Sequence, residues 1–266
     1  MAEPISVDGY RRPSPGVLAL EAPRAVGEMG IYAASALMLR SLPRGDGHPV
    51  LVLPGFTASD TSTRALRRTL RSWGYYAHGW RLGRNLGPTD EVIDGLDERG
   101  ESLAERHQQP ISLVGWSLGG IYAREAARQK ADRVRGVITL GSPFRLSVSH
   151  DSNAAELYER LSVLHSSRAD VRKRVPERER PPLPVPCTNI FTRTDGVVDW
   201  RSCLDEPGDL RENIEVYGSH CGLGHNPMAL VVIADRLALR PGQWRPFRWH
   251  RLRPRVRVRR PTRLAA

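Results

Sequence analysis

Cysteine, lysine and long hydrophobic runs are all scarce in this 266-residue chain. Its three cysteines, Cys187, Cys203 and Cys221, show neither CxxC nor zinc-ligand spacing, which argues against a disulfide framework and against a metal site. The longest apolar stretch near the start, residues 31–39, is about half of what a membrane-spanning helix needs. The first thirty residues also lack the apolar core of a signal peptide. We therefore expect a cytoplasmic protein without metal or other cofactor, and we leave peripheral attachment to a membrane open.

The positive charge of the chain is made almost entirely by arginine. All but two of the 40 basic residues are arginine, and the exceptions are Lys130 and Lys173. Because phosphate-binding proteins ordinarily use both residue types, this bias is better explained by overall composition than by function. The net charge of +11 is also uneven, since residues 241–266 hold nine arginines and no acidic residue. The rest of the chain is close to neutral, and the excess charge belongs to the C-terminal tail.

Short apolar runs alternate with amphipathic stretches through the middle of the chain. The runs predicted as strands are residues 50–56, 75–82, 111–117, 134–144, 187–192 and 214–217. The stretches predicted as helices are residues 61–73, 90–107, 118–130 and 227–239. Strands that alternate with helices of this length predict right-handed crossovers. We therefore expect an α/β fold with a mainly parallel central sheet and helices on both faces.

Three segments fall outside this alternation. Residues 1–47 are expected to form an N-terminal arm, irregular for its first 27 residues, and then a helix over residues 28–42. Residues 145–186 are too long for a plain connection, which predicts a helical, lid-like insertion in a domain spanning residues 48–240. Residues 241–266 are expected to form a separate tail rich in arginine and tryptophan.

The motif GWSLGG, residues 115–120, follows a predicted buried strand and opens a predicted helix. In that setting Gly-x-Ser-x-Gly forms a tight, strained turn that exposes the serine, here Ser117. Glycine is needed two residues to either side because the neighbouring backbone segments approach closely there. The motif alone is weak evidence, since a serine at this position can also be an ordinary helix N-cap.

Candidate acids and bases lie where two later strands end. Asp195 and Asp199 follow the fifth predicted strand, and His220 and His225 follow the sixth. Each of these residues taken singly is more often a turn, cap or core residue. Together, after a nucleophile turn and in the order serine, acid, histidine, they predict a Ser-His-Asp triad. The residues themselves leave the acid and the base each open between two candidates.

The segments VLVLPGF, GWSLGG, LGSPF, TRTDGVVD and GSHCGLGHN together resemble the α/β-hydrolase superfamily, in particular its bacterial lipase-like and esterase-like branch. The similarity spans about residues 48–240. It implies the α/β-hydrolase fold and a serine hydrolase that cleaves carboxylic esters, including lipid-like or acyl esters, through an acyl-enzyme. An acyltransferase on the same fold, in which an alcohol replaces water, remains an alternative.

The resemblance also implies roles for individual residues. It favours Asp195 over Asp199 as the acid and His220 over His225 as the base. In the family, the turn after the first of these strands and the residue after the nucleophile supply the two amides of the oxyanion hole. These amides correspond here to Phe56 and Leu118.

Clues to the substrate and to partners are few. Trp116 and Phe144, with the insertion over 145–186, suggest an apolar acyl pocket, although buried aromatic residues are more often plain core. We expect a small-molecule ester or lipid as the substrate. The tail over residues 241–266 interleaves arginine with aromatic residues and could hold an anionic membrane surface, while a nucleic acid is a less favoured partner. Acyl chain length and oligomeric state are not predicted.

Overall fold

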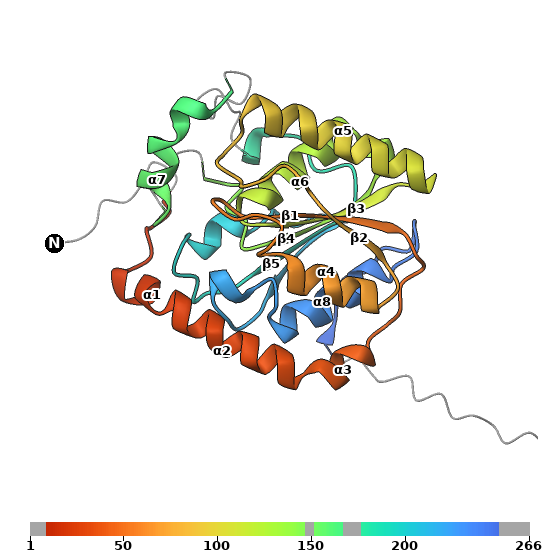
Figure 1. Cartoon of the computed structure of the whole chain (residues 1–266), viewed down its shortest axis with the longest axis horizontal. Helices are drawn as coiled ribbons and strands as arrows, with labels where there is room; N and C mark the ends of the chain where they lie inside the picture. The colour runs from red at the N-terminus through yellow and green to blue at the C-terminus, as the bar shows by residue number, and fades with distance from the viewer. Residues whose placement is uncertain (1–8, 147–151, 167–176, 250–266) are drawn as a thin grey trace, which may run out of the picture.

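A six-stranded sheet forms the centre of the molecule (Figure 1), and the computed structural model describes residues 9–146, 152–166 and 177–249. The strand order is β2-β1-β3-β4-β5-β6, and each strand is parallel to its neighbours. The strands are β1 (Pro49–Leu53), β2 (Tyr76–Gly79), β3 (Ile111–Trp116), β4 (Val134–Leu140), β5 (Cys187–Phe191) and β6 (Arg211–Glu215). The predicted α/β fold with a parallel sheet is confirmed.

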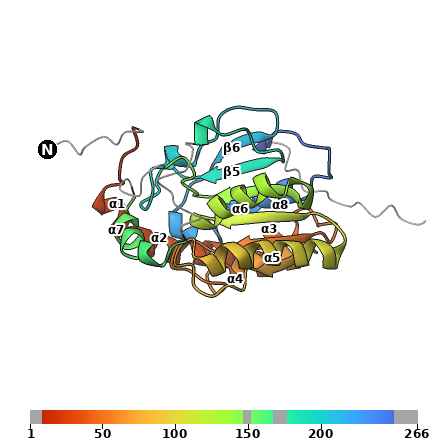
Figure 2. The same cartoon turned by 90° about the horizontal axis from the view of Figure 1, so that it is seen from above.

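Helices cover both faces of the sheet (Figures 1 and 2). Helices α4 (Arg64–Ser72) and α8 (Pro227–Leu237) pack on one face, and α5 (Asp90–His107) and α6 (Leu118–Gln129) pack on the other. Strand β1 shows how the sequence divides between the two layers. Val50 and Val52 belong to the core with α4 and α8, and Leu51 and Leu53 belong to the core with α5 and α6. Successive side chains of a strand point to opposite faces, so a continuous apolar run serves both cores.

Strand β6 begins earlier than the predicted strand over residues 214–217. Its backbone pairs with β5 from Arg211 onward, and Arg211 lies opposite Cys187 in this register. The apolar pattern located only the buried side chains of Ile214 and Val216, and Val216 lies just after the end of the strand. At the edge of a sheet the backbone ladder can run through polar residues, so hydrophobicity does not locate its start.

The N-terminal segment is helical well before residue 28. It forms α1 (Pro15–Ala19), α2 (Glu21–Ala34) and α3 (Ala36–Arg40), which run along the lower side of the molecule in Figure 1. The expectation of an irregular first 27 residues is therefore wrong for residues 15–27. The expectation rested on the prolines, but Pro15 and Pro23 each stand in the first turn of a helix, where the N–H that proline lacks would have no partner within the helix.

The insertion over residues 145–186 contains helix α7 (Ala155–Arg160) and the short 3-10 helices η3 (Ser162–Leu164) and η6 (Glu177–Glu179). Residues 147–151 and 167–176 of the insertion lie outside the described residues, as do residues 250–266 of the predicted tail.

The first part of the tail is docked on the domain. The Phe247 amide donates to Glu212 Oε2 at 2.7 Å, and Arg236 lies over the Trp244 ring with 5.3 Å between its guanidinium carbon and the ring centroid. No helix in the described part of the chain combines the length and the apolar character that crossing a membrane requires.

Candidate active site

Ser117 occupies a strained turn between β3 and α6. Its backbone has φ 51° and ψ −121°, a conformation that L-residues adopt rarely and that is found at functional sites. Although it stands at the N-cap position of α6, its side chain makes no capping hydrogen bond. The alternative of an ordinary N-cap serine therefore does not describe this residue. The turn raises Ser117 at the carboxyl end of the sheet, as the motif predicts.

The two outer glycines of the motif are required by close backbone approach. A Cβ at Gly119 would lie 2.5 Å from the Leu53 carbonyl oxygen, and a Cβ at Gly115 would overlap the backbone of Gly120. Neither neighbour is the flexible end of a side chain that could move away. The turn that carries Ser117 is thus packed directly against the end of β1.

The turn after β1 lies beside Ser117. A Cβ at Gly55 would be 3.2 Å from the Ser117 Cβ, which puts the next residue, Phe56, close to Ser117. Among the described residues, the backbone amides of Phe56 and Leu118 have no hydrogen-bond acceptor. Two free amides on either side of a serine are what an oxyanion hole needs.

Asn85 holds this turn in place and was not predicted as a functional residue. Its side chain is fully buried, and its Nδ2 donates to the Pro54 carbonyl at 2.9 Å. The Thr57 amide donates to the Asn85 carbonyl at 2.7 Å, and the Asn85 amide donates to the Ala58 carbonyl at 2.8 Å. Tyr122 of α6 also donates to Asn85 Oδ1 at 3.3 Å. The loop after β2 is therefore bonded to both sides of the Phe56 turn.

Asp195 and His220 form a buried pair. His220 Nδ1 donates to Asp195 Oδ2 at 2.6 Å, and both residues are 5% exposed. The other carboxylate oxygen of Asp195 accepts from the amides of Val197 and Val198, each at 2.8 Å. These bonds fix the carboxylate and leave His220 Nε2 as the ring atom available to a nucleophile.

The histidine lies against the strand ends next to Ser117. Trp116, the residue before the nucleophile, donates through Nε1 to the His220 carbonyl at 3.0 Å. A Cβ at Gly141, which follows β4, would be 3.0 Å from His220 Nδ1. Ser117 Oγ forms no hydrogen bond with the described residues. Serine–histidine contacts of this kind often tighten only in the complex with substrate.

Asp199, the second candidate acid, has a structural role. Its Oδ1 accepts from the Arg201 amide at 2.9 Å and caps the 3-10 helix η7 (Trp200–Cys203). Its Oδ2 accepts from the Arg11 amide at 2.8 Å. Both oxygens are engaged with backbone groups away from His220.

Two negative charges raise the pKa of His220. Burial alone lowers it, but the charge and hydrogen bond of Asp195, together with the charge of Glu21, outweigh this effect. The imidazolium form is therefore favoured more than in a free histidine. A base of this kind is suited to accept a proton during catalysis and to hold it until the leaving group departs.

Glu21 on α2 binds the backbone of the loops that carry Asp195 and His220. Its Oε1 accepts from the amide of Gly196 at 2.8 Å and from that of His220 at 3.1 Å. Its Oε2 accepts from the Cys221 amide at 2.9 Å, and Arg24 donates to Oε1 at 2.8 Å. One carboxylate therefore ties the loop after Asp195 to the loop that carries the histidine.

Glu28, two turns further along α2, binds the same histidine loop. Its Oε1 accepts from the Ser219 amide at 2.6 Å, and its Oε2 accepts from Asn226 Nδ2 at 3.1 Å. The second candidate base, His225, donates from Nε2 to the Ala25 carbonyl of α2 at 3.0 Å, which is a structural contact. No motif pointed to Glu21 or Glu28, but their spacing of seven residues on an apolar helix was a signal that could have found them.

The insertion reaches the Phe56 turn and is anchored to α6. Tyr158 of α7 packs edge-on against Phe56, with 5.3 Å between ring centroids. At the other end, Glu177 accepts from buried Arg124 at 2.5 Å and also pairs with Arg128. The described part of the predicted lid thus reaches both the Phe56 turn and α6.

The two aromatic residues predicted to line a pocket are mostly buried. Trp116 binds the histidine loop, and Phe144 lies under the Arg124 guanidinium, whose carbon is 3.7 Å from the ring centroid. Their part in substrate binding stays a prediction.

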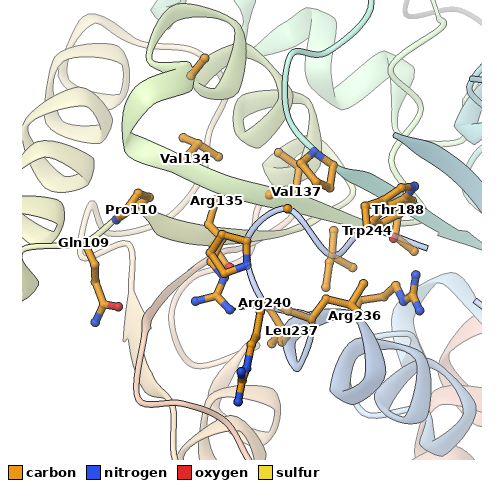
Figure 3. A pocket seen from close by; sticks show the side chains of 18 of the residues that line it. Gln109, Pro110, Val134, Arg135, Val137, Thr188, Arg236, Leu237, Arg240 and Trp244 are labelled. Carbon is orange, nitrogen blue, oxygen red and sulfur yellow. Dashed lines mark hydrogen bonds between the residues drawn. The ribbon is translucent and has the colours of Figure 1, made fainter. Parts of the chain in front are cut away.

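A cavity of about 390 Å³ lies at the other end of the sheet (Figure 3). It opens between the amino ends of β3, β4 and β5 and the end of α8, and the labelled residues include Pro110, Val134, Arg135 and Trp244. None of the predicted site residues lines it. The described residues also contain no group of three side chains that could hold a metal ion.

Comparisons with known proteins agree with this architecture. Residues 91–180 match a family described as the PGAP1-like alpha/beta domain. The lipase B of Aspergillus fumigatus superposes with a TM-score of 0.58 at 16% identity, over 74% of this chain and 54% of that one. A Bacillus licheniformis lipase superposes with a TM-score of 0.52 at 16% identity, over 74% of this chain and 94% of that one. This chain has the α/β-hydrolase fold.

Among curated proteins, this chain is similar to the pimeloyl-[acyl-carrier protein] methyl ester esterase of Shewanella woodyi. The two are 28% identical over 109 residues, which is 41% of each protein. The chain thus spans about two fifths of that curated relative. In the α/β-hydrolase fold the nucleophile, acid and histidine occur in that order along the chain, each after a strand, and here Ser117, Asp195 and His220 follow β3, β5 and β6.

Proposed function

We propose that this chain hydrolyses carboxylic esters, including lipid-like ones, with Ser117 as nucleophile, His220 as general base and Asp195 as the acid that orients it. The observation that carries the proposal is the strained, uncapped Ser117 turn at the sheet end where a buried Asp195–His220 pair is held. The names of the relatives support the reaction class, since they are an esterase and several lipases.

In the first half of the reaction, Ser117 Oγ attacks the ester carbonyl carbon while His220 Nε2 takes its proton. The carbonyl oxygen becomes an oxyanion that accepts hydrogen bonds from the Phe56 and Leu118 amides. Each such donor lowers the barrier by about 3 kcal/mol. The carbon–oxygen bond to the alcohol then breaks, and the alcohol leaves with the proton from His220.

In the second half, water attacks the acyl-enzyme and gives its proton to His220. The carbon–oxygen bond to Ser117 breaks, Oγ regains the proton, and a carboxylic acid is released. Asp195 stays ionised throughout and holds the imidazole in the tautomer whose Nε2 can accept a proton.

Covalent labelling tests the nucleophile. A fluorophosphonate probe should label wild type, whereas Ser117→Ala should not be labelled while melting as a folded protein. Ser219→Ala is the matched control, because this serine adjoins His220 but its buried hydroxyl has no hydrogen-bond partner among the described residues. Persistent labelling of Ser117→Ala, or loss of labelling only in Ser219→Ala, would overturn the assignment.

The substrate class is tested by turnover. Nitrophenyl esters and triglycerides of graded chain length should be hydrolysed by wild type and not by Ser117→Ala. Addition of a primary alcohol shows whether acyl groups go to water or to the alcohol. Labelling without turnover of any ester would reject ester hydrolysis and retain only a reactive serine.

A further inference from the structure

Helices α2 and α3 turn their polar side chains inward and their apolar side chains outward. Glu21 and Glu28 of α2 are 4% and 8% exposed, whereas Val26 is 74% exposed and Leu37 of α3 is 81% exposed. Half of the large hydrophobic side chains that are exposed in the described chain lie between residues 18 and 38. We call the following six the outer face: Leu20, Val26, Met29, Ile31, Leu37 and Met38.

This arrangement is the reverse of an ordinary surface helix, which buries its apolar side and exposes its charges. Between Arg24 and Arg40, α2 and α3 expose no charged side chain. The other exposed positions there are alanine or glycine. From Val26 onward the outer face therefore forms one uncharged strip along about 12 Å of α2 and onto α3. Contiguous apolar surface of this extent marks a site of interaction.

The charge around the outer face has one sign. The exposed charged residues nearest to it in the chain are Arg40 and Arg44. Helix α4 packs against α2, since Tyr32 Oη lies 2.8 Å from Thr69 Oγ1. It adds two more exposed arginines, Arg64 and Arg68.

The nearby carboxylates do not neutralise these arginines. Glu21 and Glu28 are buried on the histidine loop, and Asp60 accepts from the Trp80 and Arg81 amides. The exposed carboxylate of Asp46 is paired with Arg135 at 2.9 Å and with His48. Exposed positive charge therefore flanks an apolar strip without matching negative charge.

We propose that the outer face of α2 and α3 docks on a lipid surface that carries anionic headgroups. The apolar side chains enter the boundary between headgroups and acyl chains, and the flanking arginines pair with the headgroup phosphates. This site is separate from the arginine-rich tail and holds the molecule without a membrane span. A soluble protein partner would need an apolar groove surrounded by acidic side chains. An anionic bilayer has the equivalent features, an apolar interior beneath negatively charged headgroups.

Vesicle binding by the full-length protein tests the apolar part. Wild type should co-sediment with vesicles of phosphatidylcholine and phosphatidylglycerol in equal amounts. The double variant Val26→Asn/Leu37→Asn should bind about tenfold more weakly for each side chain replaced. Val163→Asn is the matched control, because Val163 is 86% exposed on η3 and should bind as wild type does. Circular dichroism melts check that all variants are folded.

The charged part is tested with lipid composition. Arg64→Gln/Arg68→Gln should weaken binding to the mixed vesicles by about fivefold for each arginine, with little further effect on phosphatidylcholine alone. Arg106→Gln on α5 is the control, because α5 lies on the other side of the sheet from α2 (Figure 1).

Two results would overturn the proposal. The first is unchanged vesicle binding by folded Val26→Asn/Leu37→Asn, which would assign binding to the tail or to another surface. The second is a dimer in analytical ultracentrifugation that this variant abolishes, without vesicle binding, which would make the outer face a contact between two copies. Neither measurement reads turnover, and both can be repeated in the Ser117→Ala background, where the proposed ester hydrolysis of the phospholipids is removed, so both are independent of the proposed role of Ser117.

Discussion

Replacing Glu21 with glutamine tests whether α2 sets the properties of His220, the proposed general base. Glu21 is 4% exposed, accepts from the amides of Gly196, His220 and Cys221, and contributes to the raised pKa of His220. Glutamine keeps the shape and one acceptor oxygen but removes the charge. It also places an NH₂ group where one carboxylate oxygen now accepts.

The change should cost both stability and turnover. If the glutamine oxygen replaces Oε1, the part-buried Cys221 amide loses its acceptor, which costs at most the roughly 1 to 3 kcal/mol of a fully buried unsatisfied donor. The bonds to Gly196 and His220 survive but lose their charge assistance, which adds about 1 kcal/mol. A shift of the histidine loop of the order of 1 Å would lower kcat by about a hundredfold. We therefore expect unfolding free energy to fall by about 2 to 4 kcal/mol and kcat to fall by ten- to a hundredfold.

The pH dependence isolates the charge effect. The proposed mechanism needs neutral His220, so kcat/KM rises as pH rises through its pKa in the free enzyme. Without the Glu21 charge that pKa falls, and the rising limb should move to lower pH while the plateau drops. Because folding favours protonated His220, its contribution to stability is complete below about pH 6.5 and is lost as pH rises through the folded-state pKa. Glu21→Gln should therefore lose part of this stabilising contribution at pH values below the folded-state pKa of His220.

Glu28→Gln is the matched control. Glu28 is on the same helix, is similarly buried and binds the same loop, but it is not among the groups that raise the pKa of His220. It should cost stability and leave the pH limb where it is in wild type. The reasoning fails if the limb of Glu21→Gln stays in place, or if both variants move it equally. The assay is kcat/KM between pH 5 and 9 with a short-chain ester that does not ionise in this range, together with urea denaturation.

Two further substitutions test other parts of the site. Asp195→Asn should lower kcat by about 10³- to 10⁴-fold, because the imidazole of His220 loses the carboxylate that orients it. Asp199→Asn should keep its capping bond to η7 and most of the activity. If steady-state kinetics show the larger loss of kcat in Asp199→Asn, the proposed acid is Asp199 instead. Asn85→Ala should lower kcat about tenfold with little change in KM, because the Phe56 turn that Asn85 holds is proposed to bind the oxyanion only in the transition state. Asn189 is equally buried, and Asn189→Ala should lower the melting temperature without this loss of kcat. If Asn85→Ala changes KM alone, the proposed role of Asn85 is wrong.

The sequence was sufficient for the parts of this protein that depend on local patterns. Runs of β-branched and aliphatic residues predicted strands, and the boundaries of α5 agree with the predicted helix over residues 90–107. Thr89 caps α5 by accepting from the Val92 amide, which is a signal between near neighbours. The Gly-x-Ser-x-Gly motif likewise encodes a steric requirement within six residues, and the structure has Ser117 in the strained turn that the motif predicts.

Contacts between segments that are distant in the chain could not be predicted from local sequence patterns. Asp195 and Asp199 both follow β5, and what separates them is that Asp199 binds the backbone of Arg11, 188 residues away. His225 is likewise engaged by the carbonyl of Ala25, 200 residues away. Only the family resemblance favoured Asp195 and His220, because the partners that exclude the alternatives lie in a segment expected to be irregular.

The dependence of the histidine loop on α2 follows from the backbone of that loop. His220 lies in an irregular segment, the short 3-10 helix η8 (His220–Gly222), so the amides of Ser219, His220 and Cys221 have no strand or long helix to accept from them. Buried amides need acceptors, and two carboxylates on one rigid helix supply them all at fixed positions. The desolvation cost of burying these carboxylates is offset by their hydrogen bonds to the loop amides and, for Glu21, by the ion pair with Arg24. The geometry of the proposed triad is therefore set partly outside residues 48–240, by a helix that the resemblance to hydrolases did not include.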